Sequence, residues 1–291
     1  MSESLQLKAY AKINLGLDVV GRRENGYHDV RMIMQTITLF DKLTFKVIEE
    51  DEIRISTNLS FLSPGENNLV YKAIKLIKDA YNIKQGMEVD LFKCIPVAAG
   101  MAGGSTDCAA ALYGTSKLFG LNLSKQELMD LGVKLGADVP YCVMRGTALS
   151  EGIGEILTPL SPMPDCTILI AKPSISVSTK FVYEHLDAKE SYEHPDIDGM
   201  ISAINNRDLQ GIADRLGNVL ETVTVPEYPV IDEIKTYMKE HGALNALMSG
   251  SGPTVFGIYD NEDEATKAKN ALLDKKLAKN AFVVKPYNVG D

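Results

Sequence analysis

Residues 96–110 read PVAAGMAGGSTDCAA, where a strand pattern ends at Pro96 and small residues lead into an alanine-rich helix pattern. Glycines let successive backbone N–H groups converge on one anion, because no Cβ atom stands in the way. The N-terminus of the following helix adds unpaired N–H donors and about half a positive charge. The stretch therefore predicts a phosphate-binding loop. A close-packed turn before a buried helix is the alternative interpretation.

Two common phosphate motifs are absent from this loop. It has no Gly-Lys-Ser/Thr, so it lacks the lysine of a Walker A motif, and its glycines do not follow the GxGxxG spacing. Ser105 and Thr106 stand where a hydroxyl can cap the helix or reach a phosphate or its magnesium. A second small-residue stretch, MSGSGPT at 248–254, reads by itself as a turn before a strand.

The N-terminal region predicts a strand hairpin. Residues 7–20 (LKAYAKINLGLDVV) alternate apolar and polar side chains, which is typical of a strand with one buried face. Lys12 and Asn14 fall on the polar face, so we expect them side by side and pointing out of the core. Asn25-Gly26 predicts a tight turn, and a second strand pattern follows from about 32 to 47. This opening favours antiparallel sheet.

The remaining elements are predicted from periodicity and capping signals. In the first half we expect a short strand at 53–55, a helix at 67–82, a strand from 87 to Pro96, a helix from the Ser124 capping box to Gly136, and a strand-like stretch at 141–144. Three prolines in 158–165 predict a boundary between domains 1–158 and 159–291. Beyond it we expect strands at 167–171, 254–259 and 281–285, with helices opening at Asp208 and Pro229 and a third at 262–277. The final strand–helix–strand is typical of an α/β plait.

The composition limits the class of protein. A chain of 291 residues, 45% hydrophobic, suggests two globular domains at roughly 150 residues each. Thirty basic against 39 acidic residues give a net charge of −9, which disfavours a nonspecific grip on nucleic acid or on an anionic membrane. The four cysteines stand singly, without zinc-ligand spacing, and no apolar run is long enough to span a bilayer. These features predict a cytoplasmic protein with reduced thiols.

Three motifs, in order, carry a resemblance to a known family: AKINLGL at 11–17, the 96–110 loop, and SGSGPT at 249–254. Together they are similar to the three motifs of the GHMP kinase superfamily. AKINL, NGYH at 25–28 and LGADVP at 135–140 further resemble the branch that phosphorylates the 2-hydroxyl of a cytidine-diphosphate-linked methylerythritol in non-mevalonate isoprenoid synthesis. One departure is that the family loop is often richer in glycine, where this chain has Ala98, Ala99 and Ala102, whose methyl groups would narrow the nucleotide pocket.

The resemblance implies an α+β fold of two domains. An N-terminal domain with a mixed sheet and helices would bind ATP and carry catalysis, and the C-terminal domain would be a ferredoxin-like α/β plait. The implied activity is an ATP-dependent phosphotransferase with an alcohol group as acceptor, using ATP and Mg²⁺. The small-molecule substrate would be the cytidine-linked methylerythritol, with no nucleic-acid or membrane partner, and the protein would be a monomer or homodimer.

The resemblance also implies roles for individual residues. Asp138 would be the general base, and Lys12 would orient it and touch the γ-phosphate. The triphosphate would be wrapped by Pro96, Val97, Ala98, Ala99, Gly100, Met101, Ala102, Gly103, Gly104, Ser105 and Thr106. The substrate would be bound by Asn14, Tyr27, His28, Thr179 and Tyr183, with the cytosine between Tyr27 and Tyr183. The second glycine loop would contribute Ser249, Gly250, Ser251 and Gly252.

Other interpretations remain open from the residues alone. Asp138 also reads as a turn acid, Lys12 as a solvated strand lysine, His28 as a solvent histidine and Phe181 as a core residue. No dedicated carboxylate for magnesium and no protein metal site is predicted. A homoserine- or mevalonate-type alcohol kinase is an alternative function, although such enzymes do not require NGYH. A non-catalytic nucleotide-binding relative is another, which the presence of both Lys12 and Asp138 disfavours.

Overall fold

The computed structural model describes residues 4–24, 26–187 and 192–289. The chain divides into two units that alternate along the sequence. Unit 1 comprises Met1–Ala11, Leu39–Val97 and Ala102–Met144; unit 2 comprises Lys12–Thr38, Ala98–Met101 and Arg145–Asp291. The first two strands, β1 (Ser4–Arg22) and β2 (His28–Ile48), contribute residues to both units. The proposed domain boundary at 158–159 therefore stays a prediction.

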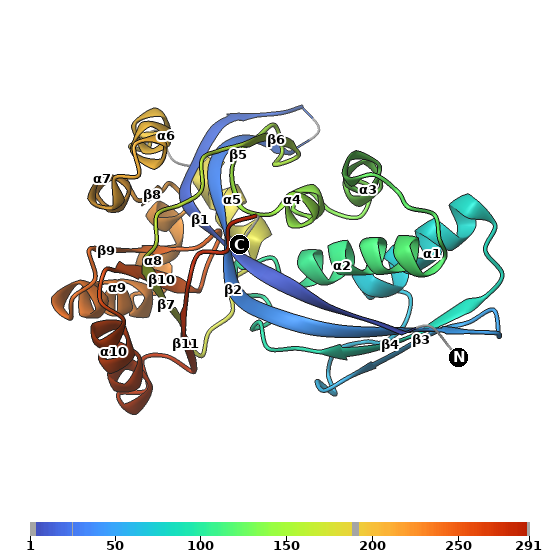
Figure 1. Cartoon of the computed structure of the whole chain (residues 1–291). Coiled ribbons are helices and arrows are strands. Elements are labelled where there is room, and N and C mark those ends of the chain that lie inside the picture. The colour runs from blue at the N-terminus through green and yellow to red at the C-terminus, as the bar shows by residue number, and fades with distance from the viewer. Residues whose placement is uncertain (1–3, 25, 188–191, 290–291) are drawn as a thin grey trace. The chain divides into compact units, whose positions relative to one another are not determined.

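Unit 1 is a mixed sheet covered by helices. Its further elements are β3 (Ile53–Thr57), α1 (Leu69–Tyr81), β4 (Gly86–Phe92), α2 (Gly103–Leu118), α3 (Lys125–Gly132) and α4 (Val139–Met144). β4 pairs antiparallel with β2 and parallel with β3, and α1 and α2 pack side by side against these strands (Figure 1). α1 forms where predicted: the Asn68 side chain accepts from the Val70 N–H at 2.9 Å, and Asn82 ends the helix in a left-handed conformation.

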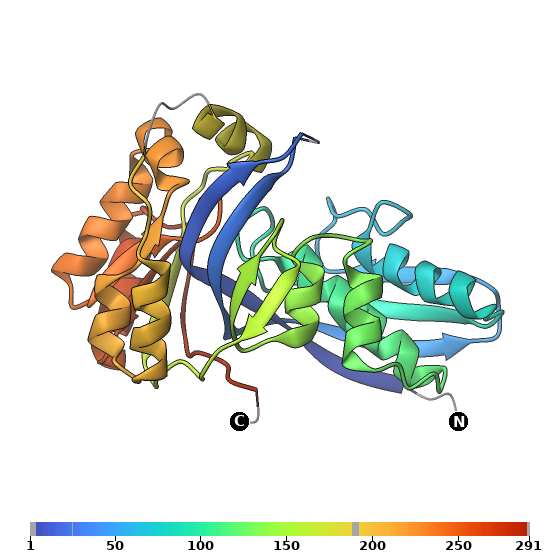
Figure 2. The same ribbon diagram turned by 90° about the horizontal axis from the view of Figure 1, so that it is seen from above.

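Unit 2 contains a second, antiparallel sheet. Its elements are β5 (Thr147–Glu151), β6 (Ile156–Pro159), β7 (Thr167–Lys172), α5 (Thr179–Asp187), α6 (Ile197–Asn205), α7 (Leu209–Asp214), β8 (Gly217–Asn218), α8 (Glu221–Glu227), α9 (Val230–Glu240), β9 (Asn245–Met248), β10 (Val255–Tyr259), α10 (Glu262–Asp274) and β11 (Asn280–Val284). The second sheet has the order β11-β7-β10-β9, and α9 and α10 pack on it, as both views show (Figures 1 and 2). In chain order these strands are 4-1-3-2, which confirms the predicted plait.

Three predicted elements differ from the structure. Residues 141–144 are helical, as part of α4, because a short apolar run does not distinguish strand from helix; the Cys142 N–H donates to the Asp138 carbonyl at 3.1 Å. α3 begins at the predicted capping box but ends at Gly132, four residues before Gly136. β4 stops at Phe92, because the next residues bond to side chains instead of a neighbouring strand.

The hairpin forms as predicted, but the polar face of β1 is covered. The turn joins β1 to β2, with the Arg23 N–H donating to the Tyr27 carbonyl at 2.7 Å; Asn25 itself lies outside the described residues. Along 11–19 every residue of β1 is buried, so both faces are packed. On the polar face, a Cβ added at Gly16 would lie 2.7 Å from Cδ1 of Ile197 on α6. The expectation that this face points out of the core is therefore wrong: a second packing layer covers it.

Candidate functional site

Lys12 and Asn14 form a buried polar pair on β1. The Lys12 Nζ donates to the Asn14 Oδ1 at 2.7 Å, and the two side chains are 5% and 0% exposed. The prediction that Lys12 and Asn14 lie side by side on one face of the strand is confirmed. The interpretation of Lys12 as a solvated lysine is excluded, because its side chain is buried. Burying an ammonium is unfavourable unless polar groups surround it. A buried lysine beside an amide therefore indicates a buried polar site in unit 2.

The first glycine loop enters unit 2 at 98–101 and runs against the second loop. Gly100 has φ +71°, and a Cβ there would lie 2.2 Å from the Ser249 carbonyl oxygen. The Ser249 Oγ donates to the Gly100 carbonyl at 3.0 Å, and the Lys12 backbone N–H donates to the Met101 carbonyl at 3.2 Å. An added Cβ at Gly250 would lie 3.6 Å from the Asn14 Oδ1. Unit 2 thus brings together four sequence-predicted elements: Lys12, Asn14 and one segment of each loop.

Two residues that sequence reasoning missed hold the second loop. The Asn218 Nδ2 donates to the carbonyls of Met248 and Gly250, both at 2.8 Å. The Glu221 carboxylate accepts the Met248 N–H at 2.8 Å and the Lys235 Nζ at 2.6 Å. Both contacts join segments about 30 residues apart, so no local pattern could reveal them. They fix the loop backbone, which a glycine-rich segment would not do alone.

Two of the three alanines of the first loop occupy strained backbone positions. Ala98 and Ala102 have φ of 51° and 55°, in the left-handed region that L-residues disfavour by roughly 1–2 kcal/mol. Ala99 lies outside that region and is buried. The loop therefore has a backbone suited to glycine at two positions that carry methyl groups in this chain.

Glycine at either strained position is expected to be tolerated or stabilising. Ala98→Gly and Ala102→Gly relieve a strain of roughly 1–2 kcal/mol, whereas the greater freedom of the unfolded chain costs about 0.4–1 kcal/mol. The free energy of unfolding should therefore rise by 0 to about 1.6 kcal/mol. Ala99→Gly is the matched control and should lower it by about 0.5–1 kcal/mol. Urea unfolding measures all three; destabilisation by Ala98→Gly and Ala102→Gly as large as that of the control would contradict the assignment of strain.

The N-terminus of α2 starts directly after this loop. Ala102 occupies the N-cap position without a side-chain cap, so the first N–H groups of the helix receive no hydroxyl or carboxylate from it. Gly104 is exposed, Ser105 half-buried and Thr106 buried. Neither Ser105 nor Thr106 occupies the N-cap position, so the capping role considered for them is not seen there. Gly104, the second residue of α2, is exposed and leaves the backbone of the first helical turn accessible to a ligand.

Asp138 stands immediately before α4 in unit 1. Its backbone carbonyl accepts the Cys142 N–H, and the Val139 N–H donates to the Gly136 carbonyl at 3.1 Å. Its side chain is half-buried. Gly132, the last residue of α3, lets the start of α4 pack closely against α3, because a Cβ at this position would lie only 2.8 Å from Cγ1 of Val139. The position is thus built by packing between α3 and α4.

His28 is held by α5. Its Nε2 lies 2.7 Å from Oδ1 of Asp187, and its ring lies 4.8 Å from that of Tyr183. The side chain of His28 is 10% exposed, which excludes the solvent-histidine interpretation, while neighbouring Tyr27 is 58% exposed. Sequence reasoning missed Asp187, the last residue of α5. The stacking of Tyr27 and Tyr183 on a base stays a prediction.

Thr179 opens α5 beside the second glycine loop. Its Oγ1 lies 2.8 Å from the Ser251 Oγ. The buried residues of this helix are Val182 and Leu186, whereas Phe181 is half-buried with its ring 3.9 Å from that of His185. The assignment of Phe181 to the core is therefore wrong, because the helix turns its Val182–Leu186 stripe inward.

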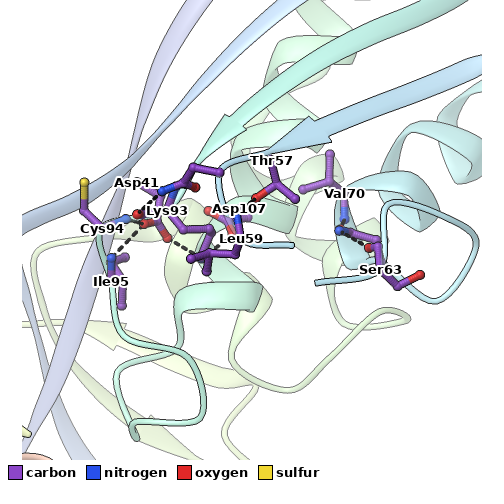
Figure 3. A network of polar contacts seen from close by, with 11 residues as sticks. Asp41, Thr57, Leu59, Ser63, Val70, Lys93, Cys94, Ile95 and Asp107 are labelled. Atoms are coloured by element: carbon purple, nitrogen blue, oxygen red, sulfur yellow. Dashed lines mark hydrogen bonds and ion pairs between the residues drawn. The ribbon is translucent and has the colours of Figure 1, made fainter. Parts of the chain in front are cut away.

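A buried ionic cluster, which we call the loop-anchor cluster (Asp41, Lys93 and Asp107), lies in unit 1. The Lys93 Nζ donates to Asp41 Oδ2 and, at 2.6 Å, to Asp107 Oδ2 (Figure 3). Asp41 Oδ1 also accepts the Cys94 N–H at 2.5 Å and the Ile95 N–H at 2.8 Å. The sequence contains two signals for this cluster: Asp107 is a charged residue within a small-residue helix, and Lys93 stands shortly before Ile95-Pro96. Neither residue belongs to a recognised motif.

The ionisation of this cluster reflects burial and its three charges. Burial lowers the pKa of Lys93, but Asp107 and Asp41 raise it more, so the net shift is upward. Burial raises the pKa of Asp107 well above its ordinary value; the Lys93 ammonium opposes this and Asp41 adds to it. The Oδ1 of Asp107 is buried without a hydrogen-bond partner. Removing one member of such a cluster typically destabilises by about 3–5 kcal/mol.

The remaining sequence predictions concern thiols, metals and membranes. Cys108, Cys142 and Cys166 are buried free cysteines and Cys94 is exposed; burial raises the pKa of Cys108 and of Cys166 to about 12. Over the described ranges, we find no cluster of three or more His, Cys, Asp or Glu side chains arranged for a metal ion. No helix in those ranges combines the length and apolar character needed to cross a bilayer.

Comparison with known proteins agrees with the motifs. Residues 68–146 match the family model "GHMP kinases N terminal domain" and residues 200–279 match "GHMP kinases C terminal". The 4-diphosphocytidyl-2-C-methyl-D-erythritol kinase of Lachnospira eligens is 61% identical over 285 residues, covering 98% of this chain and 99% of the relative. The protein of that name from Clostridium perfringens is 46% identical over 284 residues, with the same coverages.

Solved structures show the same fold. A crystal structure of 4-(cytidine 5'-diphospho)-2C-methyl-D-erythritol kinase has a TM-score of 0.83 and 29% identity, covering 97% of this chain and 99% of the other. A homoserine kinase from Cytophaga hutchinsonii has a TM-score of 0.79 at 20% identity, covering 99% and 96%, which bears on the fold alone. The predicted α+β architecture is confirmed. The chain belongs to the GHMP kinases and, within them, to the 4-diphosphocytidyl-2-C-methyl-D-erythritol kinase family.

Proposed function

We propose that this chain transfers the γ-phosphate of ATP to the 2-hydroxyl of 4-(cytidine 5'-diphospho)-2-C-methyl-D-erythritol, in non-mevalonate isoprenoid synthesis in the cytoplasm. The products are the 2-phosphate and ADP. The observation that carries the proposal is the convergence in unit 2 of the Lys12–Asn14 pair with backbone from both glycine loops. The 61% identity to a relative of that name supports the same substrate.

In this reaction Asp138 is the general base. The 2-hydroxyl oxygen forms a bond to the γ-phosphorus, the bond from that phosphorus to the β–γ bridging oxygen breaks, and the hydroxyl proton passes to the Asp138 carboxylate. Because phosphoryl transfer is dominated by positioning and charge stabilisation, a carboxylate that captures the proton late is sufficient. Lys12 stabilises the charge on the alcohol oxygen and the transferring group. Asn14 binds the sugar alcohol or its diphosphate.

The triphosphate binds to residues 96–106. The uncapped N-terminus of α2 and the exposed Gly104 supply backbone N–H donors for phosphate oxygens. Magnesium enters with ATP, because Mg²⁺ is held mainly by phosphate oxygens and water with one or two protein oxygens. The half-buried Ser105 hydroxyl fits such a single contact. When bound there, magnesium would neutralise negative charge on the transferring phosphoryl group.

The cytosine ring is recognised by the His28 side chain. In this proposal Nε2 of His28 donates to the Asp187 carboxylate, and Nδ1 of the same ring is the acceptor. An acceptor at Nδ1 pairs with the exocyclic amino group of cytosine, whereas uracil presents a carbonyl at that position. Tyr27 and Tyr183 supply aromatic faces for stacking. This pairing explains why a cytidine-linked substrate is chosen.

The function is tested by a coupled ADP-release assay with ATP and magnesium. The cytidine-linked substrate should be turned over, while free methylerythritol, homoserine and mevalonate should give only background. Turnover of homoserine or mevalonate alone would replace the substrate assignment, and bound ATP without transfer to any alcohol would identify a non-catalytic relative.

Loss of the histidine partner should weaken substrate binding selectively. Asp187→Ala is expected to raise KM for the cytidine-linked substrate about 10-fold, because a hydrogen bond to a charged group contributes about 1.5–3 kcal/mol, with a smaller change in kcat. Discrimination against the uridine-linked analogue should shrink in parallel.

The matched control for this variant is Arg22→Met. Arg22 also contacts Asp187, at 3.4 Å, so the control removes that ion pair while His28 keeps its partner. Steady-state kinetics with both nucleotides should leave this control within about twofold of the parent. Equal effects of the two variants would refute the histidine argument.

A further inference from the structure

The loop-anchor cluster joins the two chain segments that flank the first glycine loop. Lys93 follows β4 and stands three residues before Pro96, and Asp107 is the fifth residue of α2. The Lys93 ammonium bonds to Asp107, and thereby spans the loop from the residues before it to the helix after it (Figure 3). A flexible loop with its ends linked loses much of its conformational freedom.

The segment before the loop is tied down by further contacts. Asp41, on β2, accepts the N–H groups of Cys94 and Ile95. The Asn58 side chain accepts the Lys93 N–H at 2.8 Å and donates to its carbonyl at 3.1 Å. The backbone N–H groups of residues 93–95 are thus bonded to side chains from other segments, and for this reason β4 ends at Phe92.

The helix after the loop starts close to the cluster. A Cβ added at Gly103 would lie 3.1 Å from Cγ2 of Ile95 and 3.4 Å from the Lys93 Nζ. Glycine at this position therefore lets the first residue of α2 lie against the lysine. The Lys93 ammonium therefore lies next to the first residue of α2. The Lys93 side chain is 4% exposed, and its ammonium bonds to both carboxylates of the cluster.

We propose that Lys93 and Asp107, with Asp41 as their anchor, are positioning residues that preset the ends of the phosphate loop and so determine its affinity for ATP. The inference rests on the proposed assignment of 96–106 to the ATP phosphates. The Lys93 ammonium is held by the carboxylates of Asp41 and Asp107, so Lys93 acts through the loop backbone. A preset loop binds more tightly because less ordering is left to the binding step.

The test separates the tether from the charge. Asp107→Leu removes the contact to Lys93 but leaves the Lys93–Asp41 pair neutral, whereas Asp107→Asn keeps an oxygen that accepts from the ammonium. We expect Asp107→Leu to raise the Kd and KM for ATP roughly 10-fold, with the KM for the cytidine-linked alcohol within twofold. Asp107→Asn should restore ATP affinity to within threefold. Direct titration with a non-hydrolysable ATP analogue gives Kd independently of turnover.

A second buried lysine of unit 1 provides the control. Lys78 donates to Asp51 at 2.6 Å and to the Gln85 carbonyl at 2.8 Å, and neither partner belongs to the segments that flank the loop. Lys78→Met should lower the melting temperature and leave both KM values unchanged. A folded Asp107→Leu protein with unchanged ATP affinity, or an equal rise in both KM values, would overturn the proposal.

Hydrogen exchange on the unmodified protein tests the same point without a variant. Amides of 93–95 and 106–110 should be protected before nucleotide is added, and the analogue should slow exchange mainly within 97–104. Rapid exchange at 93–95 in the free protein would also overturn the proposal, even if Asp107→Leu does not fold. Failure of the proposed function is distinct: it appears as missing turnover by the unmodified enzyme, whereas these readouts require only nucleotide binding.

Discussion

Replacement of Asp138 by alanine is expected to lower kcat by about 10²- to 10⁴-fold, the range typical of a lost general base. The side chain is half-buried before α4, and its backbone carbonyl accepts a helical hydrogen bond that alanine retains. The melting temperature should therefore change by only a few degrees, and the KM for ATP should stay close to that of the parent. Single-turnover kinetics with the cytidine-linked substrate measure the chemical step directly.

Asp130 offers the matched control for this prediction. It is an exposed carboxylate on the neighbouring helix α3, where it accepts from the Gln126 side chain at 2.8 Å. Asp130→Ala should leave kcat within twofold. Turnover by Asp138→Ala at the parental rate would remove the base assignment, and the transferred proton would then need another acceptor.

Replacement of Lys12 by methionine is expected to lower kcat/KM by about 10²- to 10³-fold, as when one preorganised donor to a transition-state charge is removed. Methionine has a similar length and fits a buried position, so the fold should survive. Arginine should not rescue activity, because the planar guanidinium is bulkier than an ammonium and the Lys12 and Asn14 side chains are both buried. Steady-state kinetics and a thermal melt of each variant provide the comparison.

Lys8 is the control for Lys12. It lies four residues earlier on the same face of β1, is exposed, and its ammonium lies 4.6 Å from the Phe40 ring centroid. Lys8→Met should leave kcat/KM within twofold, since its charge is solvated. If Lys12→Met and Lys8→Met behave alike, Lys12 is a structural lysine and the charge on the transferring phosphoryl group is stabilised elsewhere.

Local signals accounted for most elements of the fold. The Asn68 cap of α1, the Ser124 capping box of α3 and the alternation of β1 each depend on neighbours within four residues, so the sequence alone was sufficient. The errors had two causes. Residues 141–144 are helical because a short apolar run does not distinguish strand from helix, and the polar face of β1 is buried by packing that reaches Gly16 from α6.

The candidate site divides in the same way. The glycine loops, Lys12, Asn14 and His28 were identified from motifs, because backbone-lined phosphate sites need small residues in a fixed order. Asp41, Lys93, Asn218 and Asp187 were not, although each bonds to one of those elements or to the residues flanking them. Their partners lie 14 to 159 residues away in the chain, and no motif spacing links them.

The order of its motifs by itself determined which family this chain belongs to, since phosphate binding and a lysine on the first strand require particular residue types at particular positions. The tertiary structure alone decided that Lys12 is buried against Asn14, that Gly100 meets the Ser249 carbonyl, and that Lys93 links the two sides of the loop. The physical reason is that burial and long-range hydrogen bonds depend on segments that are distant in the chain. The local sequence of a strand or loop does not specify which segments will pack on it.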